Sequence, residues 1–234
     1  MQHAPPPKRH PYDQWSPDTR ALDLVGDKWT LLIIRDLAAG SRRFVELQRV
    51  LPGISTEQLR SRLNRMVADG MLTRRRFREV PPRVEYELTE RARDLMPTIG
   101  ELARWGYMWT WSAPRDGEQV DIDAIFRLAP GLARLPRDVR GRLELAITDG
   151  KEGETVTLVM TASAGEVAIE EASAEDADAR ISAPTAAWVR ALLPAGDRGG
   201  LRIEGDRMLA NRLLDAIAPQ DYSATSRMKR VHIA

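Results

Sequence analysis

The sequence predicts an α+β protein made of two domains in tandem, and three observations point to this fold class. Apolar residues recur at helical spacing over most of residues 16–112, interrupted by segments that alternate like strands. Beyond residue 120 the order changes, and strands with a period of two precede amphipathic helices. A polar segment with proline and glycine, residues 113–120, lies between the two patterns and is typical of a linker.

The first domain begins with two short helices whose starts are marked by capping residues. Ser16 followed by Pro17 and Asp18 favours a helix from this point to about residue 25. Asp27 is placed to cap the next helix, which ends near Gly40. Residues 42–53 predict a short extended piece and a third helix.

The fourth helix has the clearest signals. Ser55 and Gln58 form a Ser-x-x-Gln capping box, and Gly70 ends the segment. One apolar stripe follows the helix, made of Leu59, Leu63, Met66 and Val67.

Two strands and a long helix complete the first domain. Residues 71–79 predict one strand and residues 83–88 a second, with Val80-Pro81-Pro82 as the turn between them. Thr89 caps a helix that runs to about residue 112, which Pro97 bends or divides.

The second domain, residues 121–220, predicts five strands and two helices. The strands are expected at 141–150, 154–162, 166–172, 178–183 and 200–206, and the helices at 184–196 and 207–217. Residues 1–15 contain three consecutive prolines and predict a flexible arm without the apolar core of a signal peptide. Residues 221–234 predict a tail.

The composition excludes several classes of protein. The 234 residues include 43% hydrophobic and 29% charged residues, and no apolar run approaches the roughly 20 residues of a membrane span. The absence of cysteine excludes disulfides, thiolate catalysis and cysteine metal sites. The three histidines, His3, His10 and His232, lie near the termini, so we expect no metal, no cofactor and a cytoplasmic location.

The basic residues are concentrated in one segment. Residues 1–113 hold 19 basic and 14 acidic residues, whereas residues 114–234 hold 16 and 20. Residues 41–83 alone hold 11 against 4, which favours a polyanionic partner at this segment. An arginine-rich composition imposed by GC-rich coding is the alternative explanation, and the counts alone do not separate the two.

The order of three helices and a hairpin with a basic tip is that of a winged helix-turn-helix. Several motifs in the same order make residues 16–106 closely resemble the HxlR-type bacterial transcription regulators, which are related to the MarR type. They are Gly26-Asp27-Lys28-Trp29-Thr30, Arg43-Phe44 with Glu46-Leu47, Pro52-Gly53-Ile54-Ser55, Arg62-Leu63 and Pro81-Pro82-Arg83-Val84-Glu85-Tyr86-Glu87-Leu88-Thr89. Many members of this family carry a cysteine before the first helix, where this chain has Gln14-Trp15, so a thiol switch is excluded.

This resemblance implies a regulator at the nucleoid that binds double-stranded DNA. The polar face of the fourth helix is expected in the major groove, its N-terminus at a phosphate, and the hairpin along the backbone or the minor groove. A solvated helix face and cross-strand ion pairs are the ordinary alternatives for the same residues. The residues expected at the DNA are Arg42, Arg43, Ser55, Thr56, Glu57, Gln58, Arg60, Ser61, Arg62, Asn64, Arg65, Arg76, Arg78 and Arg83.

Large apolar side chains near the end of the long helix predict a homodimer. Regulators of this type pair through terminal helices, so the interface is expected at Leu102, Trp105, Met108 and Trp109. Packing of the same side chains on the second domain is the competing interpretation.

The second domain resembles a sterol-carrier-protein-like domain, although this resemblance is weaker. It depends on "DARI" before a helix, a glycine-containing loop, "LRIEGD" and a final amphipathic helix. It implies a pocket for a hydrophobic small molecule that controls DNA binding, but apolar helix faces are also what a filled core requires. The pocket candidates are Trp188, Leu192, Leu193, Met208, Leu209, Leu213 and Ile217.

The sequence therefore predicts a homodimeric repressor that is not an enzyme. Acidic residues such as Asp149 and Glu152 have neither a base nor a glycine-rich phosphate loop near them in the sequence. A lipid or acyl carrier, or an enzyme, whose winged helix binds another protein is the alternative.

Overall fold

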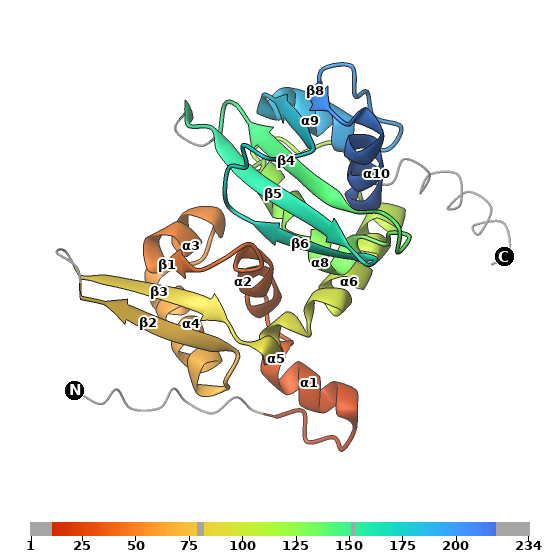
Figure 1. Cartoon of the computed structure of the whole chain (residues 1–234). Helices are drawn as coiled ribbons and strands as arrows, with labels where there is room; N and C mark the ends of the chain where they lie inside the picture. Colours follow the sequence, from red (N-terminus) through yellow and green to blue (C-terminus); the bar gives the residue numbers. More distant parts are fainter. Residues whose placement is uncertain (1–10, 79–81, 151–152, 219–234) are drawn as a thin grey trace, which may run out of the picture. The chain divides into compact units, whose positions relative to one another are not determined.

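The computed structural model describes residues 11–78, 82–150 and 153–218, which belong to two compact units, Met1–Leu95 and Met96–Ala234 (Figure 1). The expected arm is described only from residue 11. Four expected features lie outside the described residues: Val80 and Pro81 of the turn, all three histidines, and the tail.

The first unit has the predicted order of helices and strands. Its elements are α1 (Pro17–Val25), α2 (Thr30–Asp36), β1 (Arg42–Arg43), α3 (Phe44–Val50), α4 (Thr56–Ala68), β2 (Leu72–Phe77), β3 (Arg83–Leu88) and α5 (Glu90–Arg93).

The predicted helix starts are confirmed by hydrogen bonds. Ser16 Oγ accepts from the Thr19 backbone N–H, and Pro17 occupies the first helical position of α1. Asp27 Oδ1 accepts from the backbone N–H groups of Trp29 (2.9 Å) and Thr30 (3.1 Å), which satisfies two donors at the start of α2.

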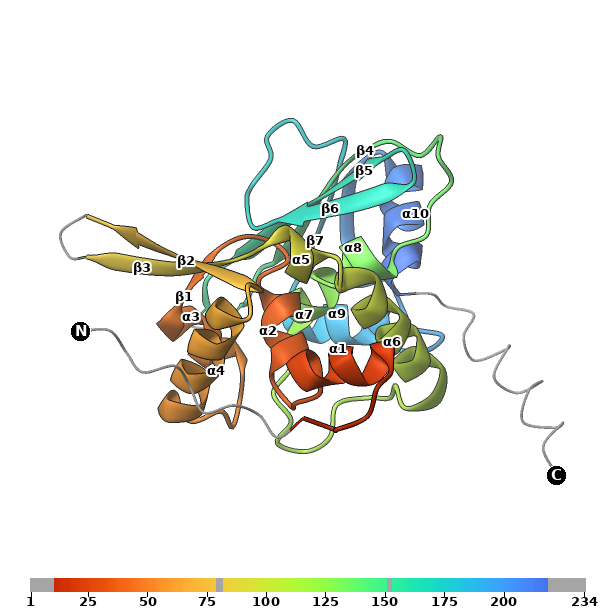
Figure 2. The same cartoon turned by 90° about the horizontal axis from the view of Figure 1, so that it is seen from below.

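A three-stranded sheet in the order β1-β3-β2 packs beside the helices. The strands pair antiparallel, with Arg42 and Arg74 on either side of Tyr86. Hairpin β2–β3 projects from helices α3 and α4 in Figure 2. The apolar stripe predicted for α4 faces the core, where Leu59, Leu63 and Met66 are buried.

The long helix expected after Thr89 is divided. Thr89 Oγ1 accepts from the Ala92 N–H and caps the short α5, and the next helix, α6, spans Met96–Trp109. Pro97 lies in the first turn of α6, where a missing N–H costs no helical hydrogen bond. The helix is therefore divided just before Pro97, between Arg93 and Met96, because proline is tolerated in the first turn of a helix but not in its interior.

The second unit has a five-stranded sheet with helices. Its elements are α6, α7 (Ile122–Phe126), α8 (Ala129–Leu132), β4 (Gly141–Ile147), β5 (Val156–Ser163), β6 (Glu166–Glu170), β7 (Ala179–Ala183), α9 (Thr185–Leu192), β8 (Arg202–Gly205) and α10 (Arg207–Ile217). All five predicted strands and both predicted helices are present, whereas α7 and α8 were not predicted.

The sheet order is β6-β5-β4-β7-β8, with β4 and β7 parallel and the other neighbours antiparallel. In the register Leu145 lies opposite both Leu158 and Ile181, and all three are fully buried. Because side chains alternate along each strand, these residues lie on one apolar face of the sheet. Helices α8 and α10 contact the sheet.

Helix α6 packs closely on α8 within the second unit. A Cβ atom on Gly100 would overlap the Gly131 backbone, and one on Gly131 would overlap that of Met96. Arg104 donates to the carbonyl oxygens of Gly131 (3.2 Å) and Leu132. The compact units therefore divide between Leu95 and Met96, whereas the sequence places the boundary at residues 113–120.

Candidate nucleic-acid interface

The N-terminus of α4 is fixed by the predicted capping box. Ser55 Oγ accepts from the Gln58 N–H and Gln58 Oε1 accepts from the Ser55 N–H, both at 3.1 Å. Gln48 of α3 donates through Nε2 to Thr56 Oγ1 (2.8 Å), which ties the preceding helix to this end of α4. The start of α4 is thereby held in place while its outer side chains stay in solvent.

The polar face of α4 is exposed over its first two turns. Glu57 and Arg60 form an ion pair at 3.1 Å, with 81% and 59% of their side chains exposed. Such an exposed pair contributes about 0–1 kcal/mol and is easily exchanged for a base or phosphate contact. The other predicted residues of this face are Ser55, Thr56, Gln58 and Ser61, which are exposed, and Asn64 and Arg65, which are half-buried.

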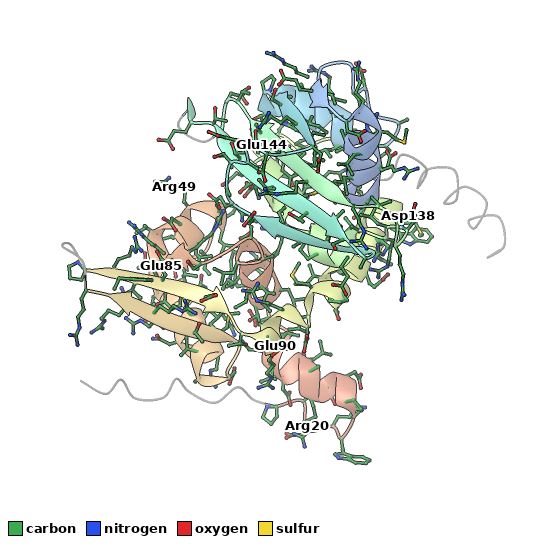
Figure 3. All side chains as sticks on the ribbon, in the orientation of Figure 1. Arg20, Arg49, Glu85, Glu90, Asp138 and Glu144 are labelled. Atoms are coloured by element: carbon green, nitrogen blue, oxygen red, sulfur yellow. The ribbon has the colours of Figure 1, made fainter. Side chains whose placement is uncertain are left out.

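On one face of hairpin β2–β3, arginine side chains form ion pairs with glutamates. Arg75 Nη2 lies 2.9 Å from Glu87 Oε2, and Arg83 Nε lies 3.0 Å from Glu85 Oε1. The Arg83 guanidinium also lies over the Phe77 ring, 4.5 Å from its centroid. Glu85 is labelled on β3 in Figure 3. Arg83, which was predicted at the DNA, is therefore engaged inside the hairpin.

The other face carries Arg74 and Arg76 on β2, and Arg78 continues the alternation directly after the strand. All three side chains are exposed, and we call them the arginine row. None of the three forms an ion pair with a carboxylate of the described residues. Arg74 lies opposite the buried Tyr86, and β2 contacts α4, so the row is on the helix side of the hairpin. Alternate residues of a strand are about 6.7 Å apart, a spacing suited to successive phosphates.

Arg74 was missed in the sequence although a signal for it was present. It precedes Arg76 and Arg78 with a period of two, which places all three on one face of a strand. The sequence does not show which face of the hairpin also carries the carboxylates. The pairing register shows it, because Glu85 lies opposite Arg75 and Glu87 lies opposite Thr73.

The structure separates the two arginines before α3. Arg42 is buried, with 8% of its surface exposed, whereas Arg43 keeps 48% of its side chain exposed and lies 3.9 Å from Glu46. Of these two predicted phosphate contacts, only Arg43 is offered to solvent.

Arg62 points away from the open face of α4. Its Nη1 atom lies 3.1 Å from Asp27 Oδ2, and the two side chains are 22% and 19% exposed. The same Asp27 carboxylate caps α2 through the backbone N–H groups of Trp29 and Thr30. Arg62 thus connects the middle of α4 to the start of α2.

The residues predicted at a dimer interface form a partly exposed stripe on α6. Leu102, Trp105 and Trp109 recur at helical spacing and are 55%, 55% and 42% exposed. Met108 lies about 100° away around the helix and is half-buried. Beyond the helix, Trp111 Nε1 donates to the Leu192 carbonyl oxygen (3.0 Å).

Most residues predicted to line a ligand pocket are packed in the core of the second unit. Trp188 is fully buried, donates through Nε1 to the Ala146 carbonyl oxygen (3.0 Å) and contacts Phe126 edge to face. Met208, by contrast, is 66% exposed on α10. The remaining candidates are Leu192, Leu209, Leu213 and Ile217, which are buried, and Leu193, which is half-buried.

Residues 11–78, 82–150 and 153–218 contain no group of three histidine or carboxylate side chains placed to hold a metal ion. Within the same ranges, no helix combines the length and apolar character needed to cross a membrane.

Two families match the chain. The family described as HxlR-like helix-turn-helix matches residues 24–113, and the SCP-2 sterol transfer family matches residues 122–217. The first match covers α2 to α6, including the hairpin, and leaves out most of α1. The second covers the five-stranded sheet with α7 to α10.

Curated relatives match the same N-terminal part and are named HTH-type transcriptional regulators of uncharacterised role. One from Halalkalibacterium halodurans is 42% identical over 40% of this chain and 83% of its own length, and one from Synechocystis is 39% identical over 40% and 69%. One from Mycobacterium tuberculosis is 48% identical over 37% of this chain and 54% of its own length. The solved structure of the redox regulator HypR in its reduced form shares 37% identity over 39% of this chain and 90% of its own, with a TM-score of 0.38.

Proposed function

The chain belongs to the HxlR-like helix-turn-helix family of transcriptional regulators, and we propose that it binds a pseudo-palindromic operator as a homodimer. The observation that carries this proposal is the arginine row beside the exposed polar face of α4. One surface offers hydrogen-bonding groups for base edges, and the other offers guanidiniums that have no ion-pair partner among the described residues and can bind the backbone.

Helix α4 enters the major groove in this proposal. The side chains of Glu57, Arg60 and Ser61 are exposed, and a carboxylate, a guanidinium and a hydroxyl recognise different base edges. Asn64 and Arg65 continue the same face, so they are proposed as further base contacts. The backbone N–H groups at Thr56 and Glu57 lie at the positive end of the helix dipole, where a phosphate is stabilised.

The hairpin acts along the backbone or in the adjacent minor groove. Arg74, Arg76 and Arg78 have no carboxylate partner among the described residues, so docking a phosphate breaks no ion pair. Arg43 adds a further phosphate contact from the start of α3. These contacts fix the orientation of the protein and carry little sequence information.

We propose that the stripe of Leu102, Trp105 and Trp109 pairs with the same stripe of a second copy. Large aromatic side chains left in water are typical of protein interfaces. A two-fold dimer would present two α4 helices to half-sites about 34–36 Å apart. The regulator would act as a repressor at the nucleoid, in the cytoplasm.

The second unit is proposed to control DNA binding through a hydrophobic small molecule. The match to the SCP-2 sterol transfer family supports this, whereas the buried Trp188 and Leu213 show a packed interior. A ligand would therefore have to displace core side chains or bind near the exposed Met208. A coupling free energy of about 1–3 kcal/mol between ligand and operator would be sufficient for control.

A gel-shift titration of the full chain on DNA from its own upstream region tests the DNA proposal. Six to ten phosphate contacts predict a loss of roughly 10³–10⁵ in affinity between 50 and 200 mM salt. An affinity that does not depend on salt, or equal affinity for operator and unrelated DNA, contradicts it. Adding fatty acids or sterols to delipidated protein tests the ligand: melting temperature and operator affinity must both change.

A further inference from the structure

We infer that Arg62 is a positioning residue that holds α4 through Asp27 and does not itself contact the duplex. This rests on the proposed function, because the consequence is measured at the operator. The inference also gives Asp27 of the Gly26–Thr30 motif a role, although Asp27 lies outside the proposed DNA surface.

Arg62 and Asp27 form an ion pair that is largely shielded from solvent. Arg62 Nη1 and Asp27 Oδ2 are 3.1 Å apart, and about four-fifths of each side chain is shielded from solvent, at 22% and 19% exposure. The neighbouring Arg60 keeps 59% of its side chain exposed. A guanidinium held in a shielded ion pair would have to abandon it to reach a phosphate, whereas Arg60 gives up only a surface contact.

The Asp27 carboxylate is held by hydrogen bonds from Trp29 and Thr30. Its Oδ1 atom accepts from the N–H groups of Trp29 and Thr30, and its Oδ2 atom accepts from Thr30 Oγ1 at 2.5 Å. Thr30 is fully buried and begins α2. The carboxylate is therefore fixed to the core by three hydrogen bonds, so it is a rigid anchor for Arg62.

Helix α4 is attached to two other helices of the first unit. The start of the helix is tied to α3 by Gln48 and Thr56, and the Arg62–Asp27 pair ties its middle to α2. Two attachments on different helices restrict the rotation of α4 about its own axis. A small rotation would move Glu57, Ser61 and Arg65 relative to the bases, since base contacts require side chains held in a defined geometry.

The test uses Asp27→Asn, because positioning of α4 by Arg62 and direct DNA contact by Arg62 predict opposite changes in operator affinity. Asparagine keeps a capping oxygen for α2 but removes the charge that holds Arg62. If Arg62 only positions α4, operator affinity falls, by roughly 10-fold for a coupling between contacting residues. If Arg62 contacts DNA, Asp27→Asn removes a negative charge that competes with the phosphates for the guanidinium, so operator binding tightens and the inference is overturned.

Salt dependence supplies a second readout. Arg62→Gln is expected to lower operator affinity to a similar degree with the slope of log K against log salt unchanged, because no phosphate contact is lost. A slope reduced by about 1 would identify a phosphate contact and overturn the inference. The double variant with Asp27→Asn should be no weaker than either single variant, and Arg62→Lys should recover part of the affinity.

Hydrogen exchange on the free, full-length protein keeps the inference testable if a variant binds poorly for other reasons. Arg62→Gln and Asp27→Asn should both accelerate exchange in α4 more than in the other helices of the first unit, and Arg60→Gln should not. Unchanged exchange in α4 would overturn the inference. If wild-type protein shows no salt-dependent DNA binding, the proposed function fails, and the exchange result still decides whether the pair holds α4.

Discussion

Among the described residues, eight arginines of the second unit form ion pairs with carboxylates of that unit, whereas the arginine row on the hairpin of the first unit has no such partner. The eight are Arg104, Arg115, Arg127, Arg134, Arg142, Arg180, Arg198 and Arg202. Arginine content alone therefore does not indicate a nucleic-acid surface. What distinguishes the hairpin is that its described carboxylates, Glu85 and Glu87, lie on one face and the arginine row lies on the other.

Arg127 is the most deeply buried of these eight arginines. Its side chain is 1% exposed and lies 3.0 Å from Asp123 Oδ2 and 2.8 Å from Glu171 Oε2. Burial disfavours the charged guanidinium and lowers its pKa, but the two carboxylates outweigh burial, so the pKa of Arg127 is raised. The charge is thus retained and matched within the unit.

The largest expected effect comes from Arg127→Ala. Removing the buried Arg127 guanidinium takes its cation away from the Asp123 and Glu171 carboxylates and should lower the free energy of unfolding by about 3–5 kcal/mol. Because Glu171 is half exposed, the lower end of this range is expected. Denaturant unfolding measures the loss. The surviving folded protein should keep the wild-type salt slope at the operator, and a reduced slope would remove the contrast between the two units.

The next effect is expected from replacing the arginine row. The triple variant Arg74→Ala, Arg76→Ala, Arg78→Ala should leave unfolding nearly unchanged, because these side chains are exposed. At about 1 kcal/mol for each lost contact, operator affinity should fall roughly 100-fold. The slope against log salt should fall by about 3, measured by gel shift at several salt concentrations.

Arg75→Ala is the matched control for the row. It removes a guanidinium between Arg74 and Arg76, but one that is paired with Glu87 on the opposite face. Affinity and salt slope should stay close to those of the wild type. If Arg75→Ala and Arg76→Ala have the same effect, the two faces of the hairpin are not functionally different, and the proposal for the row is wrong.

Trp105→Asp tests the apolar stripe of α6. Placing a charge at the centre of a self-complementary interface should weaken dimerisation by about 2 kcal/mol or more, roughly 30-fold in Kd. Sedimentation at micromolar concentration measures the shift from dimer to monomer. Met208→Asp is the control, since Met208 is also exposed but lies on α10 outside the stripe. A wild-type chain that sediments as a monomer contradicts the proposed dimer.

Local signals in the sequence were sufficient for most of the first unit. Ser16, Asp27 and Ser55 act on backbone groups within three residues, so their capping roles could be predicted without tertiary structure. The short helices α7 and α8 have five and four residues, too few for a periodic apolar pattern, and they were missed. The close approach of α6 to α8 depends on facing glycines far apart in the sequence, so no local pattern indicates it.

The candidate site was predictable in location but not in its individual contacts. Helical periodicity placed Arg62 on the flank of α4, from which its side chain reaches either a duplex or Asp27. The choice depends on the packing of α4 near the start of α2. In the same way, the pairing of Arg83 with Glu85 requires the strand geometry, which the alternating pattern alone does not supply.

The smallest expected effect concerns specificity, and it distinguishes α4 from the hairpin. Arg65 is half-buried on the polar face of α4 and forms no ion pair with the described residues. Arg65→Ala should lower affinity for the operator by about 1–3 kcal/mol while affinity for unrelated DNA changes much less. Binding to a library of operators with single base changes measures this, since discrimination should be lost at one position in each half-site. Loss of affinity that is equal on all sequences would instead assign Arg65 to the backbone, together with the arginine row.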